Sequence, residues 1–188
     1  MNVIVEITTD LGDSIDSIES LYSSDTIQQV TLITTNELYE IIDIADIIID
    51  DDAENTLQNI QTIQSIFENS PRIICYNLKE KMGAFKRVID YYKLDIKYNH
   101  ADILCILDYT RDIVKKVNRY GVVDPTMNDI TMKLFDENFI DIRDSRYSAL
   151  TINRICKQLQ IDYKLKTFSK QTLFSYFAKS FKNIKINI

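Results

Sequence analysis

Residues 1–9 read MNVIVEITT, an apolar and β-branched run that predicts a buried strand. Similar runs follow at residues 29–34 (QVTLIT), 45–49 (ADIII) and 72–76 (RIICY). Amphipathic helical patterns lie between or after these runs, at residues 14–22, 54–67 and 82–92. Strands that alternate with helices favour right-handed crossovers. The sequence therefore predicts an α/β fold with a Rossmann-like parallel sheet and helices on both of its faces.

Charge is divided unevenly along the chain. Residues 1–71 contain fifteen Asp or Glu and no Lys or Arg, whereas residues 145–188 contain nine Lys or Arg and one acid. A basic region of this kind indicates a polyanionic partner such as nucleic acid, or else a solvated lysine-rich face. We expect an acidic Rossmann-like sensor domain at residues 1–95 and a basic, mainly helical domain at residues 96–188.

Several classes of protein are not supported by the sequence. No apolar run approaches the roughly 18–20 residues that span a bilayer, and the N-terminus lacks the basic segment of a signal peptide. The three cysteines are far apart and form no CxxC pair, so we expect buried thiols and a cytoplasmic location. His100 has no triad partner beside it, and neither GxxxxGK[ST] nor GxGxxG occurs. No organic cofactor is predicted.

The pattern becomes helical after Ala101, with an apolar stripe from Ile103 to Val117 that ends near Gly121. A short strand is expected at residues 139–142, followed by amphipathic helices at residues 151–159 and 169–181. This order is compatible with a winged-helix unit. The residues expected to contact nucleic acid are Arg143, Arg146, Arg154, Lys157, Lys164, Lys166, Lys170, Lys179 and Lys182. Alternatively, the Phe/Tyr stripe of the last helix forms a core or a protein-docking surface, or lies on an anionic membrane.

The segment VEITTDLGDSIDSIESLYSSDTIQQVTLITT, residues 5–35, resembles the opening of a CRISPR-associated Rossmann-fold (CARF) domain. The segment YNLKEKMGAF, residues 76–85, resembles the loop after the fourth strand of that family, although the paired glycines are absent. The resemblance implies a cyclic oligoadenylate ligand at a homodimer interface and a C-terminal effector, which in one branch is a winged helix. The ligand-binding residues that it implies are Thr9, Gly12, Ser14, Thr35, Asn77, Lys81 and Met82.

A second arrangement of residues favours a different chemistry. Carboxylates that meet at strand ends are the ligands from which Mg²⁺ sites are built, and four acids of this kind are Glu6, Asp10, Asp50 and Asp52. Their order is similar to that of the Toprim fold, although Ile7 stands where that pattern usually has glycine.

Three hypotheses follow. The first is a ligand-sensing, nucleic-acid-binding regulator, for example of transcription, that is not an enzyme and needs no cofactor. The second is a Toprim-like, Mg²⁺-dependent nuclease or phosphotransfer protein. The third is a non-catalytic protein-interaction module.

Overall fold

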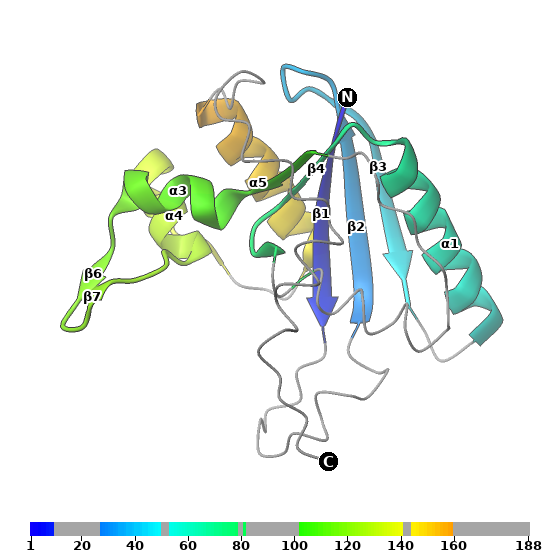
Figure 1. Cartoon of the computed structure of the whole chain (residues 1–188), viewed down its shortest axis with the longest axis horizontal. Helices are drawn as coiled ribbons and strands as arrows, with labels where there is room; N and C mark the ends of the chain where they lie inside the picture. The colour runs from blue at the N-terminus through cyan, green and yellow to red at the C-terminus, as the bar shows by residue number, and fades with distance from the viewer. Residues whose placement is uncertain (10–26, 50–52, 79–80, 82–101, 141–143, 160–188) are drawn as a thin grey trace, which may run out of the picture.

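The computed structural model describes residues 1–9, 27–49, 53–78, 81, 102–140 and 144–159 (Figure 1). In chain order the elements are β1 (Asn2–Thr9), β2 (Ile27–Thr35), β3 (Ile41–Ile48), α1 (Ala53–Asn69), β4 (Arg72–Cys75), β5 (Asp102–Cys105), α3 (Ile106–Val114), β6 (Val117–Asn118), β7 (Gly121–Val122), α4 (Met127–Phe135) and α5 (Ser145–Leu159). The strands predicted at residues 1–9, 29–34 and 72–76 and the helix predicted at residues 54–67 are confirmed. The strand predicted at residues 45–49 begins earlier, at Ile41. The helices predicted at residues 14–22 and 82–92 lie outside the described residues.

The main sheet has five strands in the order β3-β2-β1-β4-β5. Strand β1 pairs with β4, and β4 with β5, in parallel, whereas β1 with β2 and β2 with β3 pair antiparallel. The predicted α/β fold is confirmed, and the predicted parallel pairing is confirmed for β1–β4 and β4–β5 but is wrong for β1–β2 and β2–β3. Residues 36–40 are all that connect β2 to β3, and a parallel crossover needs about a dozen residues or more.

The sheet has an apolar core on each face, because side chains alternate between faces along a strand. One face packs against α1, whose buried side chains recur at helical spacing: Ile60, Ile63 and Phe67. Strand residues of this first core include Val3, Val5, Ile7, Val30, Leu32 and Ile73. The second core lies on the opposite face, where α5 packs across β1 and β2, and includes Ile4, Ile33, Ile74, Ile130, Ile152 and Ile155. Figure 1 shows α1 and α5 on opposite sides of the sheet.

The segment after residue 101 differs from the predicted single helical stripe. Residues Asp102–Cys105 form β5, which extends the main sheet, and the helix α3 begins only at Ile106. Helix α3 ends at Val114, where Lys115 adopts left-handed backbone angles (φ 50°) and donates its N–H to Arg111 O. The antiparallel β6–β7 pair then precedes α4.

The boundary predicted at residue 95 does not separate two cores among the described residues. Strand β5 belongs to the same sheet as β1, and α5 packs on that sheet, so residues from both sides of the boundary share the second core. Helix α5 begins at Ser145 rather than at the predicted Thr151, and residues 139–140 are not in a strand. The helix predicted at residues 169–181 lies outside the described residues. No described helix is both long enough and apolar enough to cross a membrane.

Candidate functional site

Glu6 lies near the end of β1, the central strand, and its side chain is almost completely buried. It forms an ion pair with Lys81, whose Nζ lies 2.8 Å from Glu6 Oε1. The same Nζ donates a hydrogen bond to the carbonyl oxygen of Ile7 over 2.7 Å. A buried carboxylate is costly unless it is neutralised, and the ion pair with Lys81 reduces this cost for Glu6.

A second carboxylate lies in the same cross-strand row. Glu6 pairs with Thr31 of β2, and Thr31 pairs with Asp46 of β3. The Thr31 hydroxyl donates to Asp46 Oδ1 over 2.7 Å and lies 2.6 Å from Ser145 Oγ, at the start of α5. Arg146 NH1 donates to Asp46 Oδ2 over 2.9 Å. These contacts hold the first turn of α5 against β2 and β3, and they neutralise Asp46.

The described carboxylates do not fit a metal ion. Two strand spacings of about 4.8 Å separate the backbones of Glu6 and Asp46, and each of the two carboxylates binds a basic side chain. Within the part of the chain that the structure describes, no three His, Cys, Asp or Glu side chains come together. Of the predicted metal ligands only Glu6 is described; Asp10, Asp50 and Asp52 lie outside that part.

Among the described residues that the CARF resemblance implies, Thr35 lies apart from Thr9, Asn77 and Lys81, which share the end of the sheet where the parallel strands β1 and β4 end. Thr9 ends β1 and Thr35 ends β2, and these strands are antiparallel with Asn2 opposite Thr35. Thr9 and Thr35 therefore lie at opposite ends of the strand pair, seven residues or about 24 Å apart. At this separation the two threonines do not line the same ligand-binding loop. Asn77 and Lys81 follow β4, and Lys81 N donates to Asn77 O. The others lie outside the described residues: Gly12, Ser14 and Met82.

Three of the predicted nucleic-acid contacts are described, all on α5. Arg146 binds Asp46, and Arg154 binds both oxygens of Glu137, with 2.8 Å from NH2 to Oε1. The hydrogen bond from Arg154 lowers the pKa of Glu137. Lys157 is exposed. The remaining residues of the set lie outside the described residues and stay a prediction: Arg143, Lys164, Lys166, Lys170, Lys179 and Lys182.

The prediction of buried thiols is confirmed for two of the three cysteines. Cys75 and Cys156 are buried, Cys105 is half-buried, and all three are free. Cys75 and Cys105 pair in register at the ends of β4 and β5. Burial raises the pKa of each of the three thiols, so they are poor nucleophiles.

Sequence reasoning missed Asp46, Ser145 and the contact between Glu6 and Lys81. Asp46 joins the row of Glu6 only because β2 and β3 pair as a hairpin, which places Thr31 between the two carboxylates. Ser145 joins the same row through its contact with Thr31. The sequence feature that could have indicated the hairpin is the short connection at residues 36–40, which begins with the turn-forming residue Asn36. In the structure, Asn36 Oδ1 accepts hydrogen bonds from the backbone N–H groups of Leu38 and Glu40.

Comparisons with known proteins identify the fold and no family. No family model matches the chain, and no curated protein matches its sequence. Among solved structures, the chain is similar to exonuclease I, in a structure reported as suggesting how processivity is achieved. The TM-score is 0.62 at 13% identity, over 86% of this chain. This chain spans 41% of that exonuclease chain, so the similarity concerns one part of it and shows the fold alone.

Proposed function

We propose that this chain is a nucleic-acid-binding protein built on an exonuclease-like fold, and that it holds nucleic acid without a metal-dependent reaction at Glu6. The proposal rests on the Glu6–Lys81 ion pair, set on the central strand of a sheet that is similar to exonuclease I. The similar fold supports nucleic acid as the partner, and the ion pair disfavours a metal ion at Glu6.

The electrostatics of the pair support this conclusion. A divalent cation bound by Glu6 would lie beside the ammonium group of Lys81, which is 2.8 Å from the same carboxylate. Like charges at such a distance repel each other, and displacing Lys81 would leave a mostly buried ammonium without this partner. The described residues offer no second unneutralised carboxylate in the row, since Asp46 binds Arg146.

The test is an equilibrium binding titration of the full chain against fluorescently labelled single-stranded and duplex oligonucleotides. Fluorescence anisotropy is measured at about 50 and about 200 mM salt, over which log K should fall linearly with log salt concentration. We expect dissociation constants within the roughly 10⁻⁴–10⁻⁶ M range of sequence-independent binding. If the chain binds neither the single-stranded nor the duplex oligonucleotide, the proposal is overturned.

A Mg²⁺-dependent nuclease is the second candidate, and the similarity to exonuclease I favours it. In this hypothesis Glu6 acts together with Asp10, Asp50 and Asp52. The candidate requires that millimolar Mg²⁺ or Mn²⁺ shortens a labelled strand and that Asp50→Asn abolishes the shortening. An unchanged strand after prolonged incubation would exclude it under those conditions.

A further inference from the structure

The β6–β7 hairpin, residues 117–122, is a small projection with a defined turn. Val117 pairs with Val122 and Asn118 with Gly121, so Arg119 and Tyr120 form the tip. Gly121 has a φ of 117°, which favours glycine, and Asn118 Oδ1 accepts from Tyr120 N over 2.8 Å. Figure 1 shows the hairpin extending away from the sheet, beyond α3 and α4.

Ion pairs attach both strands of the hairpin to the neighbouring helices. On the β6 side, Lys116 Nζ lies 2.6 Å from Asp129 Oδ2 of α4. On the β7 side, Asp124 Oδ1 lies 2.7 Å from Arg111 NH2 and accepts from Arg111 Nε over 2.7 Å. The Val123 N–H also donates to the Lys116 carbonyl over 3.0 Å. Lys116, Asp124 and Arg111 are therefore occupied by structural contacts at the base of the hairpin.

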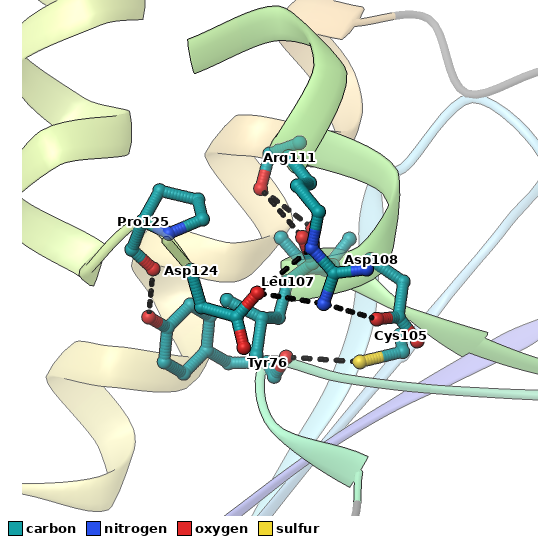
Figure 2. A network of polar contacts seen from close by, with 9 residues as sticks. Tyr76, Cys105, Leu107, Asp108, Arg111, Asp124 and Pro125 are labelled. Carbon is teal, nitrogen blue, oxygen red and sulfur yellow. Dashed lines mark hydrogen bonds and ion pairs between the residues drawn. The ribbon is translucent and has the colours of Figure 1, made fainter. Parts of the chain in front are cut away.

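A polar network connects this base to the ends of β4 and β5 (Figure 2). The Tyr76 hydroxyl donates to Pro125 O over 2.6 Å, just after the hairpin. The Tyr76 carbonyl accepts from Leu107 N over 3.0 Å and from Cys105 Sγ over 3.3 Å. The hairpin is thus fixed relative to the sheet edge at which β4 and β5 end.

The tip presents a different chemistry from the base. Tyr120 is 80% exposed, and Val117 and Val122 are each 67% exposed. The Arg119 guanidinium lies 4.6 Å from the centre of the Tyr120 ring. Residues 113–123 contain three basic residues and no acid, and Lys115 and Arg119 are exposed. An exposed aromatic ring beside a guanidinium on a fixed projection, with the exposed Lys115 at its base, offers a stacking surface and cations of the kind that bind unpaired bases and their phosphates.

We infer that the β6–β7 hairpin is a contact site for single-stranded nucleic acid, in which a base stacks on Tyr120 while Arg119 and Lys115 contact phosphates. This inference rests on the proposed function and adds to it the binding element and the form of the nucleic acid. A single strand fits better than a duplex, because the ring of Tyr120 offers a flat surface to which only an unstacked base has access.

The experiment measures the affinity of the full chain for labelled oligothymidylate by fluorescence anisotropy. Tyr120→Ala should weaken binding by about 5- to 150-fold, the effect of removing one base–aromatic stack, whereas Tyr120→Phe should retain the affinity. Arg119→Gln should reduce the slope of log K against log salt by about 0.7 for each phosphate that the side chain neutralises. Leu38→Ala, at an exposed position 70% accessible in the β2–β3 turn, and Lys133→Gln, at an exposed position on α4, are matched controls.

The outcomes separate this inference from the proposed function. Binding by the native chain that weakens by this factor in Tyr120→Ala and is retained in Tyr120→Phe and both controls supports the hairpin site. Binding that is equal in all variants overturns the hairpin site and leaves the proposed function standing. A preference for duplex over oligothymidylate overturns the single-strand assignment, and no binding by the native chain overturns both. Circular dichroism of each variant checks that the fold is retained.

Discussion

Replacing Lys81 with methionine tests the reasoning about the candidate site. At 2.8 Å, and with an effective dielectric constant of about 20, the attraction between Lys81 and Glu6 is about 6 kcal/mol before desolvation is subtracted. The side chains of Lys81 and Glu6 are only 14% and 8% exposed, so solvent screens this pair little. Removing one partner of a buried ion pair costs about 3–5 kcal/mol, because the remaining charge stays buried. We therefore expect Lys81→Met to lower the free energy of unfolding by that amount.

Urea unfolding followed by tyrosine fluorescence and far-UV circular dichroism measures this decrease. With an m-value of about 2 kcal/mol/M, the midpoint should fall by about 1.5–2.5 M urea. The double variant Glu6→Met with Lys81→Met removes both charges and keeps similar volumes, so it should recover most of the stability. Lys133→Met changes the net charge equally at an exposed position and should leave the stability within about 0.5 kcal/mol of the native value.

A decrease below about 1 kcal/mol in Lys81→Met would refute the reasoning, because it would place the pair among solvent-screened surface ion pairs. A double variant less stable than Lys81→Met would also contradict it.

Further predictions concern other buried or paired groups. Thr31→Val removes the hydroxyl that contacts Ser145 and should cost about 1–3 kcal/mol in urea unfolding, whereas an unchanged midpoint would mean that this contact adds nothing. Burial acts to raise the pKa of Asp129, but hydrogen bonds, above all from Lys116, outweigh it and lower that pKa. Asp129 therefore contributes stability above its unfolded pKa of about 3.9 that is lost as pH falls through the lower folded value. The unfolding midpoints of native and Asp129→Asn chains should accordingly converge in acid, and a constant difference would contradict this sign. Burial raises the pKa of the Cys156 thiol, so iodoacetamide should leave Cys156 unmodified in the native chain and alkylate it in urea, as peptide mass mapping can show.

The sequence predicts those elements whose apolar pattern is unambiguous. Strand β1 is a continuous run of buried residues and helix α1 has buried residues three to four positions apart, and these patterns locate both elements within two residues. Strand direction has no such pattern, so the antiparallel pairing of β2 and β3 is not predicted. Their turn contains neither Gly nor Pro, and Tyr39 adopts the left-handed angles there (φ 61°). Burial of Tyr39 in the second core offsets that unfavourable backbone conformation.

The candidate site is predicted only in its parts. The sequence indicates Glu6 as a metal ligand and Lys81 as a ligand-binding residue, each on separate grounds. Their ion pair depends on the tertiary contact between β1 and the segment after β4, and the hydrophobic periodicity of the sequence does not predict such contacts. The sequence does not predict where α3 ends, because Lys115 rather than glycine takes the left-handed position that ends the helix.

The most direct test of the account follows binding and strand length in one sample. The native chain is incubated with a 5′-labelled single strand in millimolar Mg²⁺, and the bound fraction and the length of the strand are measured over time. The account predicts a salt-sensitive complex in which the strand keeps its full length. Progressive shortening of the strand that requires Glu6 would contradict it.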